Sequence, residues 1–205
     1  MPLLLISFWL FPFNSIFAAT DYQAALIPND KFLSQEFYLD QIKADDGWDI
    51  ASESPQIIVA VIDSGVDISH PDLADNIWRN PDEVAGDKID NDHNGFVDDV
   101  NGWDFILNIP DPRPKFGGHY SVLGINHGTI VAGVIGAIGN NNFGLTGVSW
   151  KIRIMPLRVM DGEGGGQSTA VYNAIKYAMA EKADIINLSM VGAVFDPLLN
   201  DIIAE

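Results

Sequence analysis

The sequence predicts an α/β fold, a three-layer arrangement in which a doubly wound parallel sheet carries helices on both faces. One observation is a continuous β-branched run at 57–62, typical of a strand buried on both faces. A second is the segment 127–139, whose small and apolar residues suit a closely packed helix. The third is an alternation of strand, helix and strand over 152–159, 170–182 and 184–190, which favours a parallel sheet with helical crossovers.

The first predicted strand ends at a carboxylate. Its run IIVAVI, residues 57–62, is followed directly by Asp63, Ser64 and Gly65. In open parallel sheets, functional groups gather outside the carboxyl ends of the strands. Asp63 is therefore a candidate functional residue because of its position alone.

A polar segment separates this strand from the first predicted helix. Residues 66–126 are rich in Asp, Asn, Gly and Pro, and we expect loops with short elements there. The predicted helix then begins at His127, which places this side chain in the first turn. Because the positive end of the helix dipole disfavours an imidazolium, His127 is expected to be a neutral base at neutral pH.

The second half of the chain repeats the strand and helix pattern. Glycines at 162–166 indicate a flexible loop after the second predicted strand. Ser168 or Thr169 is expected to cap the helix 170–182, and the run DIINLSM at 184–190 is the third predicted strand. Connections this short imply right-handed crossovers between parallel strands.

The composition limits the possible functions. A chain of 205 residues with 47% hydrophobic residues is suited to one globular domain. Its net charge of −17 repels nucleic acid phosphates and anionic membrane surfaces, so nucleic acid is not an expected partner. Because there is no cysteine, any chemistry must come from serine, histidine and carboxylate side chains.

The first 20 residues predict export. Residues 1–20 hold a short apolar run followed by small residues near Ala18 and Ala19, as in a cleavable secretory signal. A membrane anchor needs about 20 predominantly apolar residues, whereas this run is interrupted by Pro12 and Asn14. We expect a secreted or periplasmic protein without stable membrane insertion after signal cleavage.

Two motifs carry a resemblance to the subtilisin-like serine protease family. They are VAVIDSGVDISHPDL at 59–73 and NHGTIVAGVIGA at 126–137, which resemble the family's aspartate and histidine motifs in that order. The resemblance continues through 149–168 and 183–190. It implies that residues 21–205 are the N-terminal part of a subtilisin-like peptidase domain, with the sheet incomplete at the C-terminus.

This resemblance assigns roles to individual residues. Asp63 would orient His127 and stabilise its cation, and His127 would transfer protons during cleavage of polypeptide substrates. Ile130 stands where the family usually has a histidine. By the same resemblance, two facing walls would bind the substrate backbone, and their residues are Gly164, Gly165, Gly166, Ser189, Met190 and Gly192.

Calcium is the expected cofactor. Oxygen-bearing side chains alternate around Gly95 in the segment 90–99, as in EF-hand-like loops, and a solvated acidic loop is the alternative. The candidate ligands there are Asp90, Asp92, Asn94, Asp98 and Asp99. The family resemblance implies a second structural site that joins Asp72 to Asn141 and the carbonyls of the loop 139–145.

Two functions remain open at this point. The first is a serine endopeptidase with an Asp-His-Ser triad. No Gly-Thr-Ser segment and no oxyanion asparagine of the family's kind is found in the sequence, so a truncated or inactive form is expected. The alternative is a non-catalytic secreted module that binds calcium or peptide.

Overall fold

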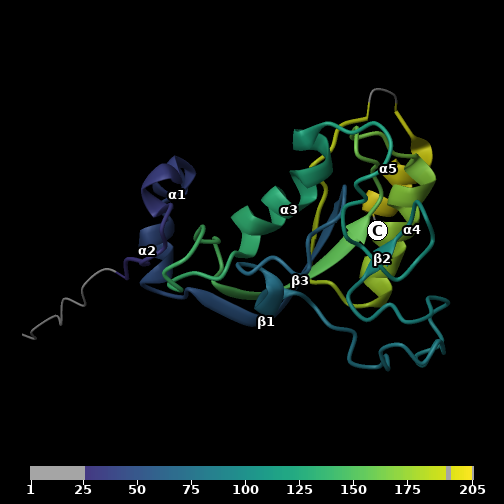
Figure 1. Ribbon diagram of the computed structural model, residues 1–205, viewed down its shortest axis with the longest axis horizontal. Coiled ribbons are helices and arrows are strands. Elements are labelled where there is room, and N and C mark those ends of the chain that lie inside the picture. Colours follow the sequence, from purple (N-terminus) through teal and green to yellow (C-terminus); the bar gives the residue numbers. More distant parts are fainter. Residues whose placement is uncertain (1–25, 193–194, 205) are drawn as a thin grey trace, which may run out of the picture.

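A four-stranded sheet forms the centre of the computed structural model, which describes residues 26–192 and 195–204 (Figure 1). Its strands run in the order β2-β3-β1-β4 and every neighbouring pair is parallel. They are β1 (Glu53–Asp63), β2 (Trp103–Asp104), β3 (Lys151–Arg158) and β4 (Ile185–Asn187). The predicted parallel sheet is confirmed, while the predicted signal at 1–20 lies outside the described residues.

In the described residues, five α-helices and two short 3-10 helices connect or flank these strands. The α-helices are α1 (Phe37–Ile42), α2 (Ala44–Trp48), α3 (Val122–Gly136), α4 (Ser168–Ala180) and α5 (Pro197–Ala204). The 3-10 helices are η1 (Leu33–Gln35) and η2 (Ala74–Asn76). Within the described part of the chain, none of the helices combines the length and the apolar character that crossing a membrane requires.

Alternate residues of β1 point to opposite faces of the sheet, which explains the continuous apolar run. Ala60 and Ile62 are buried against α4, whereas Val59 and Val61 are buried against α3. Figure 1 shows α3 and α4 on opposite sides of the sheet. The predicted three-layer arrangement is therefore confirmed, with a hydrophobic core on each side of β1.

Two helix starts differ from the prediction. Helix α3 begins at Val122, because the Ser121 hydroxyl accepts a hydrogen bond from the Gly124 amide at 2.7 Å and caps the helix five residues earlier than expected. His127 thus lies in the second turn, where the helix dipole acts more weakly. Helix α4 begins at Ser168 after Gln167, and neither Ser168 nor Thr169 provides a side-chain cap.

The polar stretch before β1 contains helices that the sequence did not indicate. Trp48 of α2 packs against Trp150 with ring centroids 5.3 Å apart, in a separate small hydrophobic cluster. Two buried acidic residues, Asp30 and Glu36, accept hydrogen bonds from the segment 140–146. These contacts hold the N-terminal segment against a loop more than a hundred positions later in the chain.

Candidate active site

Asp63 and His127 form a close pair at the carboxyl end of β1. The Nδ1 atom of His127 lies 2.9 Å from both carboxylate oxygens of Asp63. The Asp63 side chain is fully buried, whereas the His127 side chain is 44% exposed. Since Nδ1 faces the carboxylate, Nε2 at the opposite edge of the ring is the atom left for proton transfer.

Small residues allow β1 and α3 to approach closely enough for this pair. A Cβ on Gly128 would lie 2.4 Å from the Gly65 carbonyl oxygen and 3.0 Å from the Asp63 Cβ. The Ser64 hydroxyl accepts a hydrogen bond from the Gly128 amide at 3.1 Å and also bonds the Ile125 carbonyl. Ser64 is a positioning residue that the sequence motif contained but did not identify by itself.

A further backbone hydrogen bond fixes the carboxylate. The Ser64 amide donates to Asp63 Oδ1 at 2.6 Å. The buried carboxylate therefore has a backbone donor and the imidazole as partners, which compensates its loss of hydration. Its orientation is set before any substrate arrives.

A cavity of about 380 Å³ opens beside His127, and we refer to it as the His127 cavity. Five of the six residues predicted to bind substrate line it, and they are Gly164, Gly166, Ser189, Met190 and Gly192. Gly165 instead lines a neighbouring cavity with Phe105 and Ile106. The segments 164–166 and 189–192 thus form two walls of one cavity, although they are distant in the sequence.

Other residues of the His127 cavity were not identified from the sequence. Met160 and Leu199 both line it, and Met160 also forms an isolated antiparallel bridge with Gly166. The Ser189 hydroxyl donates to Asn187 Oδ1 at 2.8 Å, so it is directed to a neighbour within the same segment. No sequence signal could have placed Leu199 here, because α5 reaches the cavity only through the tertiary fold.

Two carboxylates of the loop 90–99 converge with a third from outside it, and we call them the acidic cluster: Glu83, Asp92 and Asp99. One oxygen of each lies within 4.8 Å of the others. Asp92 and Asp99 were predicted ligands, but Glu83 was missed because it precedes the motif. Asn94 lies beside them and donates from Nδ2 to both aspartates and to Glu181.

The other two predicted carboxylate ligands of this loop, Asp90 and Asp98, are not among the three converging carboxylates. Asp98 accepts hydrogen bonds from the amides of Gly86 and Lys88. Asp90 accepts from the amides of Asn94 and Gly95, which closes the turn around Gly95. Both carboxylates hold turns of the loop, and Asp90 shares the Asn94 amide with Asp92. Of the three converging carboxylates, Asp92 and Asp99 are predicted ligands and Glu83 is an addition.

The electrostatics of the acidic cluster fit a hard cation. Burial raises the pKa of Asp99 above its ordinary value, and the charge of Asp92 adds to this effect. Burial likewise raises the pKa of the adjacent Glu181. Converging carboxylate oxygens are the donors that calcium prefers, and a divalent ion would relieve the repulsion among them.

The second predicted calcium site brings together the expected residues and one more. Asn141 Nδ2 donates to Asp72 Oδ1 at 2.8 Å, and the Leu145 amide donates to Asp72 Oδ2 at 2.8 Å. Asp30 accepts from the amides of Asn140 and Asn141, at the same loop. Asp30 belongs to the N-terminal segment and carries no motif that would have identified it.

Known proteins resemble this chain over most of its length. Residues 54–197 match the model of the subtilase family. A subtilisin-like protease 1 of Plasmodium berghei is 35% identical over 162 residues, which cover 78% of this chain and 26% of that protein. Thermitase of Thermoactinomyces vulgaris is 36% identical over 168 residues, 82% of this chain and 49% of thermitase.

A further relative and a solved structure extend the comparison. A halolysin-like extracellular serine protease of Natrialba magadii is 28% identical over 82% of this chain and 27% of its own length. A protease structure from Pseudoalteromonas arctica superposes with a TM-score of 0.65 at 25% identity, covering 86% of this chain and 55% of that one. The chain thus spans between about a quarter and about half of these relatives.

Proposed function

This chain belongs to the subtilase family, and from that premise we propose that it supplies the aspartate and the histidine of a serine endopeptidase. The observation that supports this most directly is the pairing of the buried Asp63 with the half-exposed His127 at 2.9 Å. A buried carboxylate on Nδ1 selects the tautomer in which Nε2 can accept a proton.

The proposed mechanism assigns one task to each side chain. His127 Nε2 takes the proton of a serine hydroxyl as the oxygen attacks the scissile carbonyl, and later gives the proton to the leaving amine. Asp63 stabilises the imidazolium formed between these steps and does not itself become protonated. The attacking serine is assigned to no residue of this sequence, and Ser189 is excluded because it lies in the cavity wall and bonds Asn187.

The proposed substrate is an extended polypeptide in the His127 cavity. The glycines at 164 and 166 have no side chains there, so a peptide backbone can approach their own backbone closely. Met160, Val171 and Leu199 give the same cavity an apolar side. We therefore propose that a substrate side chain on the acyl side of the scissile bond is apolar.

Calcium and export complete the proposal. We propose that calcium is held by the acidic cluster, with a second ion at Asp72 and the loop 139–145. In both places the ion would stabilise loops and take no part in bond cleavage. The extracellular relative from Natrialba magadii supports the proposal that this protein acts outside the cytoplasm.

An active-site label provides the test. The natural gene product is treated with a fluorophosphonate probe, which reacts only with a serine activated by a neighbouring base. We expect labelling of one serine, found by peptide mass mapping, and loss of labelling and of casein hydrolysis in His127→Ala.

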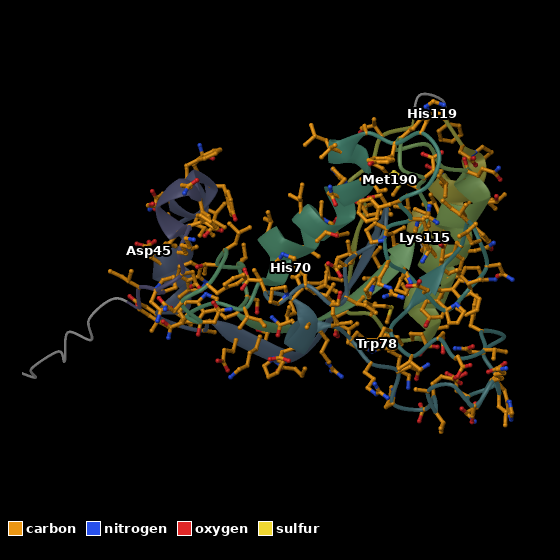
Figure 2. The ribbon with its side chains drawn as sticks, in the orientation of Figure 1. Asp45, His70, Trp78, Lys115, His119 and Met190 are labelled. Atoms are coloured by element: carbon orange, nitrogen blue, oxygen red, sulfur yellow. The ribbon has the colours of Figure 1, made fainter. Side chains whose placement is uncertain are left out.

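The matched control is His119→Ala, since His119 is exposed and lies in a loop outside the His127 cavity (Figure 2). It should retain both labelling and hydrolysis. Equal labelling in the His127→Ala and wild-type proteins would contradict the assigned role of His127. Peptide binding without any labelling of the wild-type protein would favour the non-catalytic module.

A further inference from the structure

A second and larger cavity, of about 690 Å³, lies along another face of α3, and we call it the Ile130 cavity. Asn126 and Ile130 line it, while Gly124 and His127 line the His127 cavity. Successive residues of a helix are about 100° apart, so these two pairs point in different directions. The helix that carries His127 therefore has a cavity on each of two faces.

The walls of the Ile130 cavity are fixed to the same strand end as Asp63. The Val66 amide donates to the Pro112 carbonyl at 3.1 Å, and the Asp67 amide donates to the Thr129 hydroxyl at 3.0 Å. Gly65, with φ +102°, lies so close to the loop that a Cβ would be 2.6 Å from the Pro112 oxygen. The cavity and the Asp63–His127 pair thus share one rigid frame.

The residues that line this cavity come from separate parts of the molecule, and some of them are apolar. Figure 2 shows two of its lining residues, His70 below α3 and Lys115 well apart from it on the side of β2 and α4. Two apolar side chains on its walls are open to solvent, since Phe116 is 67% exposed and Ile130 is 50% exposed. Such a groove can hold more than one residue of an extended chain and bury an apolar side chain.

The charges along this groove compensate one another. Arg113 and Lys115 both bind the Asp111 carboxylate, at 2.7 Å and 2.6 Å. Although burial acts in the opposite direction, hydrogen bonds from these two cations lower the pKa of Asp111 to about 2, so it stays ionised. With Asp67 also on the wall, the groove offers no net positive charge to an acidic side chain.

We propose that the Ile130 cavity binds the part of the substrate that follows the scissile bond, and that it selects an apolar side chain there. This inference rests on the proposed peptidase function, in which the acyl part of the substrate occupies the His127 cavity. An extended peptide that passes His127 continues past the adjacent face of α3, where Asn126, Ile130 and Phe116 line the groove. Ile130 is then a specificity-determining residue, at the position where the sequence departs from the family's usual histidine.

Two substrate series separate this inference from the proposed function. The first series consists of peptides with a chromogenic amide directly after the scissile bond, so they report on catalysis alone. The second series continues for three residues after the scissile bond, with Leu, Asp or Gly at each of these positions. For the natural gene product we expect kcat/KM roughly tenfold higher with Leu than with Asp in at least one position.

The decisive variant is Ile130→Asn, which makes the wall polar at similar size. In this variant we expect the ratio of kcat/KM for Leu over Asp to fall roughly tenfold, towards unity. The conservative variant Ile130→Val should keep a ratio close to that of the wild type. Val148→Asn is the matched control, because Val148 is 41% exposed and lines neither cavity. It should keep the wild-type ratio.

The outcomes are distinguishable because the ratio of kcat/KM for Leu over Asp compares two substrates of the same protein, while the chromogenic amides report on catalysis separately. No hydrolysis of the chromogenic amides would overturn the proposed function itself. Hydrolysis of the amides together with no preference after the scissile bond, or with a preference for Asp, would overturn the apolar subsite. A Leu preference that persists unchanged in Ile130→Asn would overturn the assignment to this cavity.

Discussion

Two fully buried carboxylates, Asp63 and Asp99, are stabilised in opposite ways. Asp63 ends a central strand and has a backbone amide and the His127 ring as partners. Asp99 lies in a loop, accepts hydrogen bonds from neutral donors such as Asn80 and Tyr177, and has the acidic residues Glu83 and Asp92 close by.

The two environments show what keeps each of these carboxylates charged while it is buried. Beside Asp63, the compensating positive charge can arise on His127 during proton transfer. Around Asp99 the described residues bring further negative charge, so compensation must come from a proton or a cation. The first arrangement suits chemistry and the second suits a structural ion.

The largest expected effect is a loss of activity when the negative charge of Asp63 is removed. Asp63→Asn preserves the size of the side chain but favours the wrong tautomer of His127, and kcat should fall roughly 10⁴-fold. Steady-state hydrolysis of a chromogenic peptide amide by the natural gene product measures this. A loss below tenfold would show that Asp63 does not orient the base.

The second prediction concerns the acidic cluster. Calcium at about 100 times its Kd should raise the free energy of unfolding by about 2.7 kcal/mol at an occupied site. Asp92→Asn should lose much of this stabilisation, measured by thermal unfolding with calcium and with chelator. Asp75→Asn is the control, since Asp75 is exposed and is not part of the cluster. An unchanged calcium response in Asp92→Asn would refute the site.

The third prediction tests the close approach of β1 and α3 that brings Asp63 and His127 together. Gly128→Ala should destabilise the protein by about 2 kcal/mol, because the new methyl group would overlap the Gly65 carbonyl and the Asp63 side chain. Gly133→Ala in the same helix meets only the Leu145 side chain, at 3.8 Å. It should instead stabilise α3 by about 0.5–1 kcal/mol. Denaturant unfolding distinguishes the two, and equal effects would contradict the packing argument.

The smallest effect concerns a third carboxylate, Asp111, which has two cations as partners. The pKa of Asp111 is lowered to about 2 from an ordinary 3.8. Its ion pairs therefore stabilise the fold fully at pH values above 3.8, and this stabilisation is lost as the pH falls through about 2. Asp111→Asn should therefore cost about 1 kcal/mol near pH 5, after allowance for solvent screening. Unfolding of both proteins from pH 5 down to pH 2 measures the difference, which should shrink; a constant difference would exclude the ion pairs as its cause.

The sequence predicted the central part of the fold for a clear physical reason. Parallel strands buried on both faces read as unbroken apolar runs, so β1 and β3 were located within a few residues. The start of α3 was missed because its first turn, from Val122, contains Gly124 and closes the long segment 66–126 that was expected to form loops. Helices α1 and α2 were missed because their stability depends on packing against Trp150, a distant residue.

In the candidate sites, too, the sequence identified some residues and missed others. Asp63 and His127 stand within motifs, and the walls at 164–166 and 189–192 were inferred from the family resemblance. Glu83, Asp30 and Leu199 carry no local signal, because tertiary contacts alone bring them to their sites. Asp98 followed the expected spacing, yet it binds the turn at Gly86 and Lys88.

The all-parallel sheet also bears on the order of folding events. β1 must pair with β3 and β4, which follow only after long intervening segments, and such non-local pairing makes folding slow. The contact between His127 and Asp63 requires α3 to be packed on β1. The Asp63–His127 pair would consequently be among the last features that a folding molecule acquires, after most of its own backbone is protected within the core.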